Sequence, residues 1–163
     1  MNREELVRKY AAGDRDFRGI DLNEADLGGI NLSGADLRGS SMNEICLECA
    51  NLSGANLANV RMSMIILEKA DLSAANLSGA NLMMGILLNT NLNGANLSGA
   101  NLTGTDMRNA NLSNSNLTGV NLDGANLSGA NLSGANLSDA IFCETIMSDG
   151  SIRNDSCSGC NIS

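Results

Sequence analysis

Large apolar residues recur at every fifth position along most of this chain. Counting in fives from Phe17 gives Leu22, Leu27, Leu32, Leu37, Met42 and so on to Phe142, Met147 and Ile152, without an insertion or deletion. Two positions earlier stands a small residue, usually Ala, with Ile20, Ile30, Ile45, Val60, Ile65 and Val120 as larger variants. Asn or Asp commonly lies between the two. Ser, Thr or a charged residue and then Gly complete the unit.

This period predicts a chain that turns at every repeat. It fits neither a helix nor a plain strand, so neither element can run far. If the small residue and the Leu both point inward, as residues two apart do on a strand, the other three positions carry the chain round a corner. Gly, Asn and Asp suit that corner because they tolerate a positive φ. The non-glycine examples of these types are Asn59, Asn89, Asn109, Asn114, Asp139 and Asp149.

Four such corners close a square coil of twenty residues, although the period alone leaves a triangular coil open. Squares stack at about 4.8 Å, the spacing of hydrogen-bonded strands, which predicts about seven coils and a height of roughly 33 Å. Residues twenty apart, such as Leu77 and Leu97, then lie one above the other in a dry interior. A solid core of this kind leaves no cleft of the sort that active sites need.

The repeat resembles that of the pentapeptide-repeat family, with A-N-L-S-G as the typical unit. The resemblance covers residues 17 to about 152. It implies an all-β solenoid, a right-handed quadrilateral parallel β-helix with the Leu or Phe and the small residue inside. Residues 1–16 also resemble the N-terminal segments of cyanobacterial members.

The chain is expected to divide into an N-terminal cap and linker (1–16), the β-helix (17–152) and a degenerate C-terminal coil or cap (153–163). At the start, Asn2 and Glu5 are placed as a capping box, which predicts a short helix over residues 2–13 that closes the first coil. Leu6, Val7 and Tyr10 share one face of it.

At the other end the repeat decays. Asp155 falls in an inward position and Cys157 in a Leu position, and no helical pattern follows. Either a loop covers the last coil, or another molecule does. If another molecule covers it, we expect a second copy of the chain, in a symmetric homodimer with the two coil edges paired.

The composition argues against catalysis and against binding to nucleic acid. The chain has no His, so it has no Ser-His or Cys-His nucleophile and no imidazole ligand for a metal. We therefore expect no catalytic residues, no cofactor and no metal. Eighteen acidic and ten basic side chains give a net charge of −8, which opposes direct contact with phosphates.

Five cysteines occur in a chain without an export signal or a membrane-spanning apolar stretch. This favours a cytoplasmic location, with the thiols reduced and no membrane contact. Two Cys-x-x-Cys pairs, Cys46/Cys49 and Cys157/Cys160, lie roughly 26 Å apart in the predicted stack, too far for one zinc ion. Each pair stays open as a thiol-based redox switch.

The candidate binding site is a group of large apolar residues at outward positions between residues 61 and 89. Its members are Met64, Ile66, Met83, Met84, Ile86 and Leu88. Met64 and Met84 are twenty apart, as are Ile66 and Ile86, so two neighbouring coils should present one patch at a corner. Ile146 belongs to the same column further on. Such a patch is typical of a surface for a protein partner or a second copy. The alternative is a local bulge that folds these side chains back onto the coil.

Relatives associated with quinolone resistance imitate DNA and inhibit topoisomerases such as gyrase, and the resemblance implies that activity as an alternative. It requires acidic rows along the whole rod, because DNA carries one charge per roughly 1.7 Å. Between Leu72 and Leu122, however, the charged residues are Asp106 and Arg108 alone. The sequence therefore favours a non-enzymatic protein that presents a rigid face to a protein partner. DNA mimicry is the first alternative and thiol switching the second.

Overall fold

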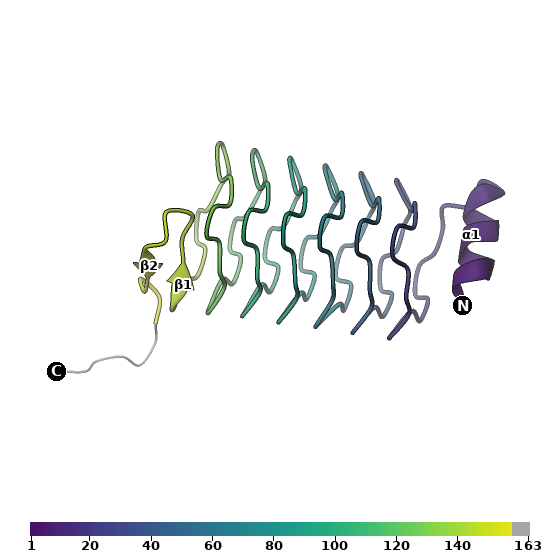
Figure 1. Cartoon of the computed structure of the whole chain (residues 1–163), viewed down its shortest axis with the longest axis horizontal. Coiled ribbons are helices and arrows are strands. Elements are labelled where there is room, and N and C mark those ends of the chain that lie inside the picture. Colours follow the sequence, from purple (N-terminus) through teal and green to yellow (C-terminus); the bar gives the residue numbers. More distant parts are fainter. Residues whose placement is uncertain (158–163) are drawn as a thin grey trace.

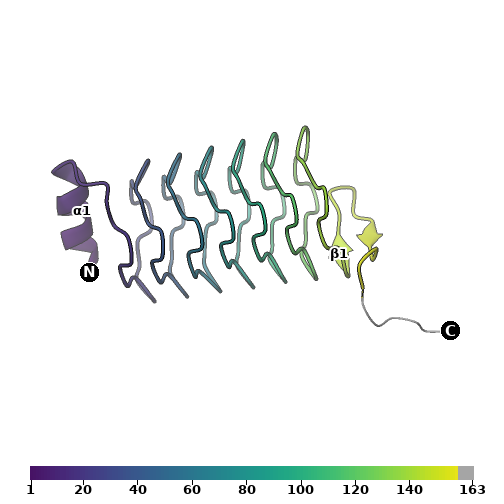
Figure 2. The same ribbon diagram turned by 180° about the vertical axis from the view of Figure 1, so that it is seen from behind.

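The computed structural model describes residues 1–157 and shows a stack of square coils with a different cap at each end (Figure 1). Helix α1 (Arg3–Ala11) lies across the N-terminal coil. Strands β1 (Thr145–Ile146) and β2 (Ile152–Arg153) form an antiparallel hairpin at the other end. The view from behind in Figure 2 shows the same regular stack between the two caps.

Backbone pairing confirms the coil of twenty residues. Every fifth residue from Asp16 to Asn126 forms a parallel bridge with the residue twenty positions later. The Leu77 N–H donates to the Asn96 carbonyl of the next coil at 2.7 Å, and the Asn76 N–H donates to the previous coil. Four repeats thus complete one coil, which excludes the triangular alternative. Because each side of the square contributes one bridging residue, long strands do not form.

The interior is filled by the Leu positions and the small positions, as predicted. Leu77 and Leu97 are both 0% exposed. Inward hydroxyl groups are satisfied by the backbone, as where the Thr90 hydroxyl donates to the Leu67 carbonyl at 2.7 Å. Gly85 shows how tightly the interior is packed, because a Cβ there would lie 2.9 Å from the Leu82 carbonyl oxygen of its own coil and 3.1 Å from a methyl group of Ile65 in the previous coil. The larger Ile65 therefore occupies space that a side chain in the next coil would need.

The corners also follow the prediction. Every fifth residue from Gly19 to Glu144 has a positive φ. Asn side chains in one coil cover glycines in the next, as where a Cβ on Gly79 would lie 2.4 Å from Asn59 Oδ1. Gly is thus required at some corners by the space available as well as by φ.

Helix α1 caps the first coil as the sequence predicts, although it spans Arg3–Ala11 instead of 2–13 and the Glu5 side chain of the predicted capping box pairs with Lys9. The Asn2 side chain accepts a hydrogen bond from the Glu5 N–H at 2.9 Å, and Leu6 is fully buried. The Tyr10 hydroxyl donates to the Ser33 carbonyl at 2.9 Å, while Arg3 donates to two carbonyls of the same coil. Val7 is largely exposed, so the packed face of the helix is narrower than expected.

At the C-terminal end the regular path stops one repeat earlier than the sequence predicts. Ile152 is 66% exposed instead of buried, because the chain reverses and β2 pairs with β1. The positive φ that the repeat places at Asp149 occurs at Gly150 instead. The last parallel bridge therefore reaches Ile146, and the expected β-helix boundary at residue 152 is too late.

The hairpin closes part of the last coil. It covers Phe142, whose ring lies 3.7 Å beneath the Arg153 guanidinium. Leu132, Ala135, Leu137 and Ala140 remain partly exposed. A loop-like cap is thus present, as one of the two predicted alternatives stated, but among residues 1–157 it leaves these four side chains partly open to solvent.

Candidate binding surface

The six predicted residues form one apolar corner patch, which comprises Met64, Ile66, Met83, Met84, Ile86 and Leu88. Met64 and Met84 are 52% and 58% exposed, and Ile66, Met83 and Ile86 are 36 to 39% exposed. Leu88 is partly exposed beside them. The structure therefore brings together all six residues on the outside of the coils.

A regular backbone carries this patch, so the bulge alternative is wrong. Met64 and Met84 have φ values of 55° and 60°, like the glycines at other corners. Ile66 and Ile86 form a parallel bridge, which keeps them one above the other. The Met84 side chain extends toward the next coil, where a Cβ on Gly104 would lie 2.6 Å from its sulfur. The regular backbone of the patch and its contact with Gly104 thus fix the positions of these side chains.

The patch is bounded along the stack. Ile146 shares the column of Ile66 and Ile86, but Asp106 and Asn126 lie between. Asp106 forms an ion pair with Arg108 at 2.7 Å, and this hydrogen bond lowers the pKa of the Asp106 carboxyl group. Other large apolar side chains exposed on the described part of the chain are Met1, Val7, Ile141 and Ile152.

Acidic side chains on the outer faces are partly neutralised by neighbouring arginines. Asp16 pairs with Arg18, and Asp36 with Arg38, each at 2.6 Å. The hydrogen bond from Arg18 lowers the pKa of Asp16 to about 2. These pairs remove negative charge from the part of the rod that is richest in acids. The charge pattern thus departs further from that of a DNA backbone.

Two cysteines form a disulfide that the sequence interpretation missed. Cys143 and Cys157 are bonded, with their Cα atoms 4.9 Å apart. The expectation of five reduced thiols is therefore wrong for these two, and Cys157 does not pair with Cys160, which lies outside the described residues. Spacing gave no signal for this bond, because the reversal of the chain brings Cys157 back to Cys143.

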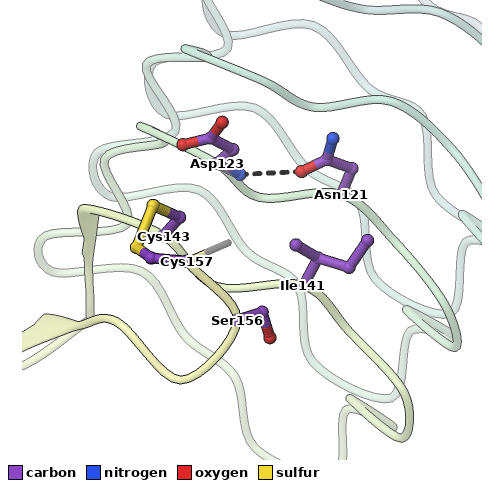
Figure 3. Close-up of a pocket in the computed structure, with 6 residues that line it drawn as sticks. All are labelled: Asn121, Asp123, Ile141, Cys143, Ser156 and Cys157. Carbon is purple, nitrogen blue, oxygen red and sulfur yellow. Dashed lines mark hydrogen bonds between the residues drawn. A yellow bond between two sulfur atoms is a disulfide. The ribbon is translucent and has the colours of Figure 1, made fainter. Parts of the chain in front are cut away.

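The disulfide borders a shallow hollow at the C-terminal end (Figure 3). Asn121, Asp123, Ile141 and Ser156 complete its wall, and the Asp123 N–H donates to Asn121 Oδ1 at 3.0 Å. Within residues 1–157 this wall holds a single carboxylate next to an amide and a hydroxyl, which is not the pair of groups that acid and base catalysis uses. The hollow is consistent with a structural end of the coil.

Cys46 and Cys49 are free thiols one coil before the apolar patch. Within residues 1–157, no three His, Cys, Asp or Glu side chains gather where they could hold a metal ion. No helix in the same range has the length and apolar character that crossing a membrane requires. The location of the protein in the cell stays a prediction.

Comparison with known proteins agrees with the coil geometry. The family model of pentapeptide repeats matches in eight copies, over residues 16–48, 49–83, 86–114 and 110–149. No curated protein sequence matches the chain. Several solved structures do.

One is Rfr23, a pentapeptide-repeat protein from the cyanobacterium Cyanothece 51142. It is 27% identical, with 84% of this chain and 96% of that chain covered and a TM-score of 0.58. HetL, from the cyanobacterium Nostoc sp. strain PCC 7120 and involved in regulating heterocyst differentiation, is 30% identical over 94% of this chain and 100% of its own, with a TM-score of 0.34. QnrB1, a plasmid-mediated fluoroquinolone resistance protein, is 23% identical over 79% and 69% of the two chains, with a TM-score of 0.50.

The likeness to QnrB1 concerns the fold alone at this level of identity. The family model spans most of the coils, and the Cyanothece structure shares both repeat and shape. This chain therefore belongs to the pentapeptide-repeat family and folds as a right-handed quadrilateral β-helix.

Proposed function

We propose that this protein is a non-enzymatic binding protein whose apolar corner patch contacts a protein partner. The observation that carries the proposal is the exposure of Met64, Ile66, Met83, Met84 and Ile86 on two adjacent coils. Apolar area removed from water contributes about 25 cal/mol per Å². Because the backbone beneath the patch is regular, little ordering is needed when a partner binds, which favours affinity.

The chemistry of the patch suits a protein surface. Methionine side chains are flexible and polarizable, so they adapt to differently shaped apolar groups. Met64 and Met84 project from the corner, while Ile66 and Ile86 form a stiffer floor beside them. Catalysis is disfavoured, because the chain lacks His and the interior is filled by Leu and Ala.

The test is a double substitution, Met84→Ser with Ile86→Ser, matched with Ile141→Ser. Ile141 is exposed and occupies the same position in its repeat, but it lies near the C-terminal hairpin. Partners recovered from an extract of the source cells are identified and purified, and their affinity for each variant is measured. We expect the double variant to lose binding and Ile141→Ser to retain it. Equal affinity of both variants contradicts the proposal.

Self-association through the open C-terminal end is a second candidate. The described residues offer no backbone acceptor to the N–H groups of Leu132 and Leu137, and both side chains are partly exposed. An unpaired edge above an apolar core can accept the same edge of a second copy. Light scattering decides this: a dimer that Leu137→Asp dissociates supports it, and a monomeric mass at micromolar concentrations contradicts it.

DNA mimicry toward gyrase has no such observation in its favour. Asp106 and Arg108 neutralise each other in the middle of the rod. A supercoiling assay tests this alternative directly, and absence of inhibition at micromolar protein removes it.

A further inference from the structure

The surface around the apolar corner patch changes in chemical character along the stack. Four outward columns meet there, and each contains residues twenty positions apart. The column of Met83 is otherwise neutral and polar, with Asn23, Asn43, Ser63 and Thr103, and the other three columns carry the change. In coil order they read Glu24, Glu44, Met64, Met84, Gly104; then Asp26, Cys46, Ile66, Ile86, Asp106; then Gly28, Glu48, Glu68, Leu88, Arg108. Two coils with carboxylates are therefore followed by two apolar coils, and then by a neutral region.

The carboxylates that precede the patch are available for a partner. Glu24, Asp26, Glu44 and Glu48 are exposed, and none lies within 4.0 Å of a basic nitrogen in the part of the chain that the structure describes. Arg3 reaches this region but donates to the backbone carbonyls of Asp26 and Gly28.

Charges nearer the apolar residues are neutralised instead. Glu68 pairs with Lys69 at 3.0 Å, and Asp106 with Arg108 at 2.7 Å. Free negative charge thus lies next to the patch on one side only, because the free carboxylates beyond it in the same columns, Asp123 and Glu144, are two and three coils away from Met83 and Met84. A partner gains from positive charge on that side and not on the other.

The backbone under the patch determines which kind of segment can bind. The Ile66 N–H donates to Ile45 of the previous coil at 3.0 Å, and the Leu87 N–H donates to Asp106 of the next coil at 2.7 Å. Because this pairing runs between coils, the face has no free edge to which a strand could add. The partner segment must satisfy its own backbone, as an α-helix does.

The spacing of the coils also fits a helix that lies along the stack. Successive coils are about 4.8 Å apart, and successive helical turns rise by about 5.4 Å. Over four coils, each turn of the helix therefore lies close to one coil. Two adjacent turns would meet the apolar coils, and the next two would meet the acidic coils.

We infer that the occupant of the apolar corner patch is an amphipathic helix of a partner protein, with apolar residues in two turns and Lys or Arg in the adjoining two. The inference rests on the proposed function and adds the class of partner. Apolar side chains of the helix pack on Met64, Met84, Ile66 and Ile86. Its basic side chains lie beside Glu24, Asp26, Glu44 and Glu48.

The probe is a pair of fluorescent helical peptides of about four turns with identical apolar residues. One peptide carries Lys and the other Glu in the two polar turns. Fluorescence anisotropy gives Kd for each peptide at low and high salt. We expect the Lys peptide to bind at least tenfold more tightly at low salt, and salt to reduce this difference. Equal Kd values for the two peptides overturn the inference.

Two sets of variants locate the contact. Glu24→Gln with Glu44→Gln should weaken binding of the Lys peptide by about three- to tenfold, the range expected for two exposed charge pairs. Glu144→Gln is the matched control, because Glu144 occupies the same column and a positive-φ corner beyond the patch. It should leave Kd unchanged. A similar loss in Glu144→Gln contradicts the placement.

The outcome separates this inference from the proposed function. If Met84→Ser with Ile86→Ser abolishes binding of the natural partner, but Glu24→Gln with Glu44→Gln and added salt have no effect, the patch is a binding site and the basic helix is wrong. If none of these variants affects the natural partner, both proposals fail. Binding to vesicles with anionic lipids in preference to the Lys peptide also overturns the inference.

Discussion

The column that contains Leu77 and Leu97 and the column that contains Met64 and Met84 have the same spacing of twenty residues. Leu77 and Leu97 are 0% exposed, whereas Met64 and Met84 are 52% and 58% exposed. All four are large apolar side chains. Position within the repeat of five, rather than hydrophobicity, therefore decides which side chains hold the fold together and which are available for contacts.

This difference has a structural cause. An inward side chain must fit the coils above and below it, as Gly85 fits against Ile65. An outward side chain has solvent on one side, so packing limits its size less, although the corners still favour residues that tolerate a positive φ. Large apolar residues at outward positions are not needed to fill the core, so they are the candidates for contact with a partner.

Removal of an interior side chain should have the largest effect. Leu97→Ala is expected to lower the free energy of unfolding by about 2 to 5 kcal/mol, because it leaves a cavity between packed coils. Urea unfolding followed by circular dichroism measures this. Leu137→Ala, in the partly open last coil, should cost less. An equal cost would show that the last coil is sealed in solution.

Loss of the disulfide between Cys143 and Cys157 should come next. The bond closes a segment with a sequence separation of 14 residues. In the chain-entropy account a loop of this length contributes about 3 kcal/mol. Thermal unfolding with and without a thiol reductant measures the effect, and Cys143→Ser with Cys157→Ser should remove the response. If the reductant leaves the Tm of the parent protein unchanged, the disulfide does not stabilise the fold and the prediction is wrong.

Alanine at a corner glycine should have an intermediate effect that depends on the neighbouring coil. Gly54 and Gly79 both have a φ of 64°, but only a Cβ on Gly79 would meet a neighbour, Asn59 Oδ1. Gly54→Ala should cost about 1 to 2 kcal/mol from the left-handed backbone alone, and Gly79→Ala should cost more. Adding Asn59→Ala to Gly79→Ala should reduce the cost toward that of Gly54→Ala. Chemical denaturation of the four proteins gives the values.

Adjacent residues provide the most direct comparison of outside with inside. Ile86 is 39% exposed and Leu87 is 0% exposed. Ile86→Ser should change the free energy of unfolding by less than about 0.5 kcal/mol, whereas Leu87→Ser, at an inward position like that of Leu97, should cost about 2 to 5 kcal/mol. Comparison of their melting temperatures tests this, and a large loss in Ile86→Ser would place the patch within the core.

The smallest effect should come from pH acting on the exposed acidic face. The hydrogen bond from Arg18 lowers the pKa of Asp16 from its usual 3.8 to about 2. Asp16 therefore stabilises the folded state above about pH 4, and this contribution is lost as the pH falls toward 2. Asp16→Asn should lower Tm slightly at pH 6 and not at pH 2. A larger effect at pH 2 than at pH 6 would contradict the assigned direction.

Much of the fold and of the candidate site could be predicted because each repeat has the same geometry. A large apolar residue occupies the inward Leu position in every repeat from Phe17 to Phe142. The placement of Met64 over Met84 followed from that register. The exposure of the six patch residues followed from it too.

The C-terminal end could not be predicted in this way. Ile152 falls at the next Leu position of the repeat, but in the structure it is exposed and pairs with Ile146 in the antiparallel hairpin. The period predicts continuation, because nothing local distinguishes Ile152 from an inward residue. The reversal at Gly150 became visible only in the three-dimensional arrangement, and the disulfide from Cys143 to Cys157 with it.

The sequence by itself determined the turn at every fifth residue and the side of the coil on which each residue lies. Both depend on contacts between positions at a fixed separation, so a regular pattern is enough to specify them. The tertiary structure decided where the stack ends, and it decided which acids are paired and which are free. The end of the stack depends on how the chain turns back after the last coil. The pairing of each acid depends on whether a long basic side chain reaches it. The period of five residues alone specifies neither.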